Sequence, residues 1–402
     1  MYGCTERSNL AVQTYQKMLQ DGFAPNEITY SIVIISCANG ALMEIGDKLI
    51  KTIENKVQQM GPILINSIML FYGKTGNLER AVEVFESLGD KKNVITWNVI
   101  LQCCAVSGSS EEASRFFGLM IENGIEPNLK SIGSLLNAHS HSLNVEGAKD
   151  VFDQMLNKYN LIPDVHTQIS MVDVLGRSGA IEQAEDLLNS VCFDLVSDEA
   201  FGLSTLLGAC RIHGNLDVAE RIFTKLDSMG LADSASYVSM MNIYAKYELW
   251  DKRANVHAEM QRKGVKRTPG ISQVEVNGMP HKFVVSDRSF SSHEQVHDFL
   301  SEIRSKVMDL GYNPDLKCAT RQMSTREEKI QHLWEHSEKI AVAFALLNTG
   351  TDVVVTKNLR MCEDCHKASA YISMLYPDRK IKIRDASRFH TFKNGKCSCN
   401  NK

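Results

Sequence analysis

The amino-acid sequence predicts an all-α solenoid of helical hairpins followed by an α/β domain. Segments of one common plan recur about every 30 to 36 residues through residues 1–266. Apolar residues in these segments do not alternate as they do in strands. After Lys266 the pattern changes, because residues 267–287 hold two short alternating runs separated by Asn277-Gly278. That arrangement is typical of a β-hairpin.

Each repeated segment is predicted to form two antiparallel helices. An apolar first helix ends in a turn such as Ser107-Gly108-Ser109, and the second helix carries an Ala-x-x-x-Phe spacing, as in Ala113 to Phe117. Gly and Pro close the segment because both residues stop helices. Such hairpins bury their apolar faces only against their neighbours, which predicts a solenoid. The copies cover residues 27–57, 63–88, 93–128, 129–164, 168–191, 202–226 and 236–260, and residues 1–26 supply the second helix of a truncated first hairpin.

Details of the hairpins distinguish two kinds of helical repeat. Tetratricopeptide repeats have a similar period, and that alternative predicts peptide binding. The residues Thr96-Trp97-Asn98, the exits at Pro127-Asn128 and Pro163-Asp164, and hairpins of 32, 35 and 36 residues instead resemble the pentatricopeptide repeat of plant-organelle proteins with mixed repeat lengths, the PLS type. The stretch LLGACRIHGNLDVAE is similar to the terminal extension repeats of that family. The resemblance implies single-stranded RNA as the partner.

In repeats of this kind two or three side chains of each hairpin read one base. The family registration pairs Asn66 with Asn93 and Asn98 with Asn128. Asn-Asn pairs in the family favour pyrimidines. Other positions, such as Ile169, carry no side chain that hydrogen-bonds a base edge. The alternative interpretation is that these asparagines only cap or pack helices.

The second part of the chain contains a break in a helix. The capping box Thr325-Arg326-Glu327-Glu328 predicts a helix start. Residues two apart on a regular helix point about 200° from each other, so His336 and Glu338 cannot face one point from its middle. We therefore expect a break between Glu335 and Ser337, with Ser337 as the N-cap of the next helix. Strands at 352–356 and 380–384 and helices at 293–310 and after Cys365 complete the expected core.

The pattern His336-x-Glu338 followed by Cys362-x-x-Cys365 is the arrangement that nucleobase deaminases use. His336, Cys362 and Cys365 are the candidate zinc ligands, and three protein ligands leave a position open, as catalytic zinc requires. Zinc-activated water then attacks C4 of cytosine while Glu338, which is not a ligand, transfers protons. Met361 departs from the general signature, which has Pro there.

A second metal site is predicted in the tail. His366, His390, Cys397 and Cys399 supply two His and two Cys, a closed set typical of structural zinc. The motifs HSEK, CxxCH and RFHxFKxGKCSC together resemble the DYW domain, the cytidine deaminase of organellar RNA editing, and residues 267–287 resemble its PG box. All seven ligand positions match. Two departures are Thr391 for a second His and the ending Asn400-Asn401-Lys402 for Gly-Asp-Tyr-Trp, which bears on full activity.

These observations predict a protein that binds a specific single-stranded RNA and converts one cytidine to uridine, with two Zn²⁺ per chain. The resemblance implies an organelle, with mitochondrion favoured over plastid, and editing accessory proteins as further partners. No window approaches 18 consecutive apolar residues, so no membrane partner is expected. The predicted parts are the repeat array at 1–198, terminal extension repeats at 199–266, the PG-box hairpin at 267–287 and the deaminase domain at 288–402.

Alternatives to this interpretation remain open. The chain carries a net charge of −4, yet residues 267–402 hold 21 Lys and Arg against 16 Asp and Glu, which favours a polyanion near the deaminase part or simply a solvated surface. CxxCH also attaches c-type haem, and both Cys pairs can form a structural zinc ribbon. A third alternative is an RNA-binding editing factor whose own deaminase domain is inactive or acts with a partner deaminase.

Overall fold

The computed structural model describes residues 2–40, 42–53, 61–319, 323–386 and 388–399. Backbone contacts divide the chain into two compact units, which are described separately. The first unit comprises residues 1–108 together with 270–319 and 323–402, and the second comprises residues 109–269. The predicted end of the hairpin at 27–57 and the ending Asn400-Asn401-Lys402 lie partly or wholly outside the described residues. Among the described residues, no helix is long and apolar enough to cross a bilayer.

The helical part of the first unit confirms the predicted hairpins. Ala81 and Phe85, which hold the Ala-x-x-x-Phe spacing, are 0% and 1% exposed, and Asn77 caps their helix by accepting a hydrogen bond from the Arg80 N–H. The helices are α1 (Tyr2–Gln20), α2 (Glu27–Gly40), α3 (Met43–Ile53), α4 (Pro62–Lys74), α5 (Leu78–Glu86) and α6 (Val94–Ser107), with a 3₁₀ turn η2 (Gly89–Lys91) before α6.

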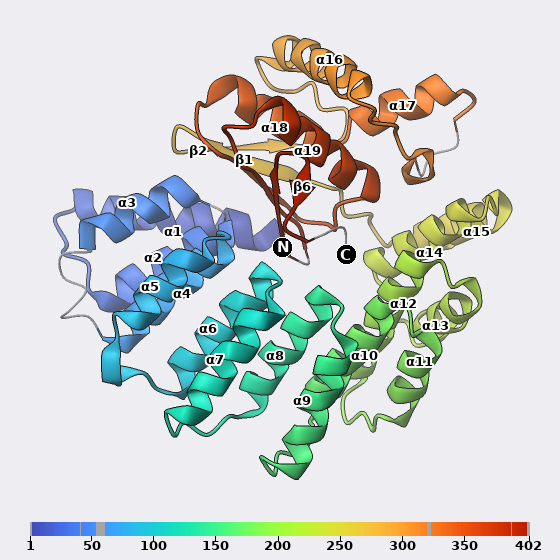
Figure 1. Cartoon of the computed structure of the whole chain (residues 1–402). Helices are drawn as coiled ribbons and strands as arrows, with labels where there is room; N and C mark the ends of the chain where they lie inside the picture. Colours follow the sequence, from blue (N-terminus) through green and yellow to red (C-terminus); the bar gives the residue numbers. More distant parts are fainter. Residues whose placement is uncertain (1, 41, 54–60, 320–322, 387, 400–402) are drawn as a thin grey trace. The chain divides into compact units, whose positions relative to one another are not determined.

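The second unit is also a solenoid of helical hairpins. The first helices of successive hairpins contact one another, α8 with α10, α10 with α12 and α12 with α14. The second helices α9, α11, α13 and α15 each pack beside the first helix of their own hairpin (Figure 1). Gly214 ends one first helix with φ +75°, a conformation that costs glycine little. The helices are α7 (Ser110–Glu122), α8 (Leu129–Ser142), α9 (Val145–Asn157), α10 (Val165–Ser178), α11 (Ile181–Ser190), α12 (Val196–His213), α13 (Leu216–Ser228), α14 (Ser234–Lys246) and α15 (Trp250–Arg262).

The α/β part is built on one mixed sheet of order β2-β1-β3-β4-β5-β6. The predicted hairpin forms β1 (Ser272–Val276) and β2 (Met279–Phe283), joined by Asn277 and Gly278 at φ +54° and +74°. Both residues at positive φ are typical of a two-residue hairpin turn. The predicted strands are observed as β3 (Val353–Lys357) and β4 (Ile381–Arg384), which run parallel. The terminal hairpin of β5 (Phe389–Lys393) and β6 (Lys396–Cys397) was not predicted.

Helices cover this sheet and hold the metal-ligand candidates. α18 (Ser337–Asn348) contacts β1, β2 and β3, and α19 (Glu363–Leu375) contacts β5 and β6 (Figure 1). Residues 337–346 of α18 are all buried, so this helix lies at the centre of the core. α16 (His293–Asp309), η3 (Leu316–Cys318) and α17 (Arg326–Trp334) complete the α/β part.

Candidate metal centres

The predicted break at His336 is present. α17 begins at the predicted capping box and ends at Trp334, and α18 starts at Ser337. His336 has extended dihedrals, φ −63° and ψ 140°, and is itself the N-cap residue. The prediction of Ser337 as N-cap is wrong by one position, because Ser337 already has its place in the first turn. The extended residue turns the His336 ring away from the direction that a continuous helix imposes.

His336, Cys362 and Cys365 form the first centre. His336 Nδ1 lies 3.6 Å from Cys362 Sγ and 3.4 Å from Cys365 Sγ. In a tetrahedral zinc site with bonds of about 2.3 Å to sulfur and about 2.0 Å to nitrogen, these edges measure about 3.5 Å. The three donors therefore fit zinc. Cys362 is also the N-cap of α19 and accepts the Cys365 N–H through sulfur at 3.3 Å, which fixes the spacing of the pair.

Hydrogen bonds prepare Cys362 to act as a ligand. The thiols of Cys318 and Cys365 donate to its sulfur, and with His336 they hold the pKa of Cys362 well below its ordinary value. The thiolate is the form that binds metals. Cys318 was not singled out from the sequence, because its 3₁₀ turn reaches α19 only through the fold: the backbone N–H of Asp315 donates to Asp364 Oδ1 at 2.9 Å.

Glu338 lies beside the first centre without belonging to its ligand group. Its side chain is 2% exposed and pairs with Lys357 Nζ at 2.5 Å. Ser337 donates to the same carboxylate at 3.1 Å. Burial raises the pKa of Glu338, but the charge of Lys357, the charge of His336 and the hydrogen bond from Lys357 together outweigh burial, so this pKa lies below its usual value. The carboxylate is therefore anionic and shielded from solvent at neutral pH.

Sequence reasoning missed two lysines at this centre. Lys357 ends β3 and also donates to Ser337 Oγ at 3.2 Å. Lys339 is 1% exposed and directly precedes the apolar stretch Ile340 to Leu347. A lysine at the start of an apolar helix is a weak sequence signal, because most such lysines reach solvent with their flexible side chains.

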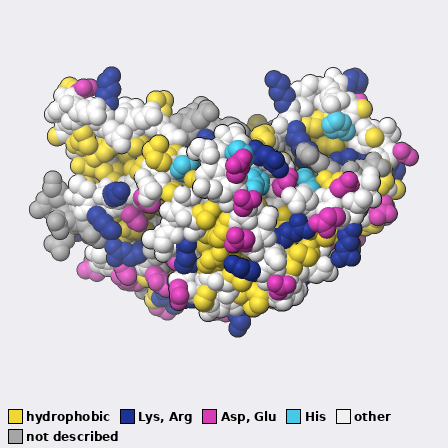
Figure 2. Space-filling model, turned by 90° about the horizontal axis from the view of Figure 1, so that it is seen from above, with side chains coloured by type: hydrophobic (Ala, Val, Ile, Leu, Met, Phe, Trp, Pro, Cys, Tyr) yellow, Lys and Arg dark blue, Asp and Glu magenta, His cyan; other side chains and the backbone are white. Residues whose placement is uncertain are grey.

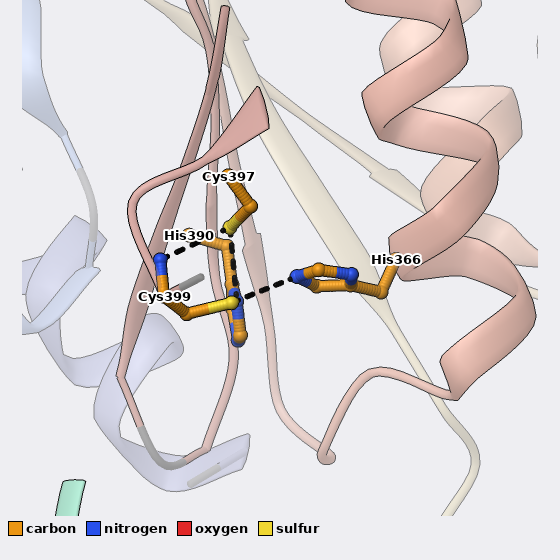
Figure 3. Close-up of side chains that lie close together, drawn as sticks. All are labelled: His366, His390, Cys397 and Cys399. Atoms are coloured by element: carbon orange, nitrogen blue, oxygen red, sulfur yellow. Dashed lines mark hydrogen bonds between the residues drawn. The ribbon is translucent and has the colours of Figure 1, made fainter. Parts of the chain in front are cut away.

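The second centre joins the terminal hairpin to α19. Figure 3 shows His366, from α19, and His390, Cys397 and Cys399, from the terminal hairpin and its end, pointing toward one another. His366 Nε2 lies 3.1 Å from Cys399 Sγ, and His390 Nδ1 lies 3.7 Å from Cys397 Sγ. Four donors within 4.8 Å of one another fit a closed tetrahedral zinc. The structure thus brings together the set that the sequence predicted.

Asp385 supports this second centre. Its Oδ2 lies 3.6 Å from His390 Nε2. Burial lowers the pKa of His390, but its hydrogen bonds to Asp385 and Cys399 and the negative charge of Asp385 together raise this pKa above the ordinary value. Metal-binding histidines commonly give their second nitrogen to a carboxylate in this way, which fixes the ring orientation.

The predicted RNA-reading asparagines fall into two groups. Asn66 on α4 keeps its buried Oδ1 without a hydrogen-bond partner in the structure, and Asn98 on α6 is 9% exposed. Asn93 and Asn128 instead cap α6 and α8, because each Oδ1 accepts two backbone N–H groups. Helix capping, the alternative role, is therefore one contact that Asn93 and Asn128 make.

An exposed isoleucine lies close to each of the two candidate RNA-reading asparagines, Asn66 and Asn98, on the first helix of its hairpin. Ile63 and Ile95 are 69% and 59% exposed, and each lies three residues before Asn66 or Asn98. Residues three apart are neighbours on one helix face. The constant spacing was a readable signal of an apolar surface beside each polar residue.

A polar groove runs along the second unit between α8 and α10. It has a volume of about 650 Å³, and its lining includes Asn128, Lys130, Asn137, Asp164 and His166. On the face drawn in Figure 2, Lys and Arg are interspersed with Asp and Glu. The groove is thus a better candidate than net charge for a nucleic-acid path.

Comparison with known families identifies the parts. Residues 311–402 match the DYW family of nucleic acid deaminases, residues 213–275 match the E motif, and residues 64–92, 92–141 and 131–159 match pentatricopeptide repeats. The chain is a pentatricopeptide-repeat protein with a DYW deaminase domain. This result confirms the resemblance drawn from HSEK, CxxCH and the repeat pattern.

Similar proteins cover nearly the whole chain. A putative pentatricopeptide repeat-containing protein of Arabidopsis thaliana is 34% identical over 97% of this chain and 57% of its own length. Two Arabidopsis relatives named chloroplastic are 37% and 34% identical; one of them is CRR2, and this chain spans 42% and 59% of their lengths. The chain thus spans about half the length of these relatives. The maize repeat protein PPR10 aligns with 16% identity and a TM-score of 0.37, over 91% of this chain and 53% of that one.

Proposed function

We propose that this protein binds a specific single-stranded RNA and hydrolytically deaminates one of its cytidines to uridine. The observation that carries the proposal is the buried carboxylate of Glu338 beside a centre of three ligands. Three ligands leave one position for a reactant, and a shielded carboxylate next to it provides a proton acceptor. The match to the DYW family supports the same reaction class.

Each residue of the first centre then has a role. His336, Cys362 and Cys365 hold zinc. Zinc, when bound, lowers the pKa of water to about 7 and so supplies a nucleophile at neutral pH. The Glu338 carboxylate accepts a proton from the attacking water and delivers it to the base, so that the 4-amino group leaves as ammonia. Burial of Glu338 keeps bulk water from exchanging that proton.

The second centre and the array have supporting roles. His366, His390, Cys397 and Cys399 hold a second, structural zinc that ties the terminal hairpin to α19. Asn66 with Asn93, and Asn98 with Asn128, read two bases, with pyrimidines preferred. The chloroplastic names of two relatives support an organellar transcript as the substrate. Family resemblance favours the mitochondrion over the plastid. Sequencing the transcripts of both organelles after loss of the protein decides between the two.

A second candidate function is supported by the contact of Lys357 with Glu338. An ammonium group 2.5 Å from the carboxylate competes with any proton that Glu338 must carry. In this alternative the chain selects the RNA, and its own deaminase domain is inactive or acts with a partner deaminase.

Glu338→Gln tests the two functions against each other. The amide keeps the size of the side chain but cannot accept the proton, so we expect conversion to fall about 10²- to 10⁴-fold while zinc content and RNA affinity stay unchanged. The matched control is Glu363→Gln, an exposed carboxylate between the two cysteine ligands, which should retain full conversion. Unchanged conversion in Glu338→Gln would favour the partner-deaminase alternative.

Base reading has its own test in Asn128→Asp. Aspartate caps a helix as well as asparagine does, so α8 is preserved while the side chain loses its N–H donors. We expect base preference to change at one RNA position only, measured by binding to a set of single-base RNA variants. Asn144→Asp is the control, since Asn144 caps α9 with the same contact and is not a predicted reader. A uniform loss of RNA affinity in Asn128→Asp would show a structural role.

A further inference from the structure

Lys339 is a buried cation in direct contact with a metal ligand. Its Nζ donates to Asp364 Oδ2 at 2.6 Å, to the Leu333 carbonyl at 2.8 Å and to Cys365 Sγ at 3.5 Å. The side chains of Lys339 and Asp364 are both 0% exposed. The ammonium also lies 5.4 Å from the centre of the Trp334 ring. All three donor hydrogens of the ammonium are therefore directed at specific acceptors.

The carboxylate of Asp364 is equally well satisfied. Its Oδ1 accepts the Tyr312 hydroxyl at 2.6 Å and the Asp315 N–H at 2.9 Å. Burying two opposite charges costs several kcal/mol per ion, and apolar residues of similar size often give equal or greater stability. Stability alone therefore gives a weak account of this pair. The position of the pair gives a stronger account, because Asp364 lies between the two cysteine ligands and Lys339 follows Glu338 directly.

We propose that Lys339 is a positioning residue of the first metal centre, which tunes the donor strength of Cys365. Its N–H group directs the Cys365 sulfur, and its positive charge draws electron density away from the thiolate. A metal held by a less donating thiolate is a stronger Lewis acid. The hydrogen bond to Asp364 sets the distance between the Lys339 ammonium and the Cys365 sulfur. This inference rests on the proposed metal-binding function of His336, Cys362 and Cys365.

A neighbouring lysine provides the contrast. Lys357 is the other cation of the centre, but its contacts are with oxygen, at Glu338 and Ser337. Removing Lys357 changes the charge near the centre by the same amount as removing Lys339. Only the loss of Lys339 removes a hydrogen bond to sulfur. The two variants therefore separate the effect of the contact from the effect of net charge.

The test uses the full chain loaded with Co²⁺ in place of zinc, because the absorption band for charge transfer from thiolate to Co²⁺ reports sulfur donation. In Lys339→Met, a variant of similar side-chain volume, we expect this band to move to longer wavelength, because Cys365 becomes the stronger donor. We expect metal loss to a chelator to become 10- to 100-fold faster, because the Cys365 sulfur is no longer held in place by the Lys339 N–H group. The difference spectrum against the parent isolates the first centre, since the four residues of the second are unchanged. Lys357→Met should leave the band in place.

Asp364→Asn keeps the test decisive if Lys339→Met does not fold. Without its carboxylate partner the ammonium leans toward Cys365, so we expect the band to move to shorter wavelength. Shifts in the same direction in both variants, or an unshifted band with Co²⁺ bound, overturn the inference alone. Failure of the parent chain to bind metal through His336, Cys362 and Cys365 overturns the proposed function instead.

Discussion

The two candidate metal centres of this protein share one helix but differ in donor number and in their neighbours. The first has three donors and is flanked by the buried Glu338 and Lys339 and the partly buried Lys357, whereas the second has four donors and the supporting carboxylate of Asp385. A fourth protein ligand removes the position that a reactant needs. Centres with similar chemistry can thus be assigned to reaction or to structure by counting donors and nearby proton acceptors.

The shared helix explains why the centres stay separate. Cys365 and His366 are consecutive residues of α19, and consecutive residues on a helix point about 100° apart. The sulfur of Cys365 therefore meets His336 at the start of α18, while the His366 ring meets Cys399 beyond the terminal hairpin.

Cys399→Ser breaks the comparison most strongly. We expect the second metal to bind roughly 100-fold more weakly, equivalent to about 3 kcal/mol, and the melting temperature to fall, while conversion by the folded fraction persists. Metal content measured by mass spectrometry should drop from two to one per chain. Cys192→Ser is the control, because Cys192 is an exposed free cysteine of the second unit. Complete loss of conversion in folded Cys399→Ser with one metal retained would place the second centre in the chemistry.

Much of the fold could be predicted because its signals are local. The hairpins follow from helix-stopping residues and from apolar spacing, and the Asn277-Gly278 turn specified the first β-hairpin. The break at His336 followed from helix geometry together with the deaminase pattern, which requires His336 and Glu338 to face one centre. These features need no knowledge of distant contacts.

The missed features depend on contacts between distant residues. The short strands β5 and β6 hold few residues, and the hydrogen bonds that define them pair Phe392 with Cys397 and Ile381 with Phe392. Lys339 and Lys357 have no local mark of function, because only the packing of α18 against α19 and β3 buries their ammonium groups. The domain boundaries predicted at residues 198, 266 and 287 and the assigned roles of the site residues stay predictions.

Asp385→Asn sharpens the comparison with a smaller effect. One oxygen, Oδ2, lies 3.6 Å from His390 and accepts the N–H of Met361 at 3.0 Å, so this carboxylate touches the second centre and the residue before Cys362. The carboxylate oxygen accepts from both the Met361 N–H and the His390 ring. An amide nitrogen at the same position is itself a donor and cannot accept from either of them. We expect the second metal to bind 10- to 100-fold more weakly, and the first to change less, in a competition with a coloured chelator that resolves two phases.

The control for this change is Asp352→Asn. Asp352 also accepts a backbone N–H, from Lys380 at 2.8 Å, but it precedes β3 and so lies at the end of that strand away from Cys362. Both chelator phases should match the parent in the control. If Asp385→Asn weakens metal binding at both centres equally, then Asp385 supports the shared fold of α19 and the sheet. In that case the two centres have separate ligands but the same supporting structure. A selective loss at the second centre instead shows that each centre keeps its own supporting residues, Asp385 for one and Lys339 for the other.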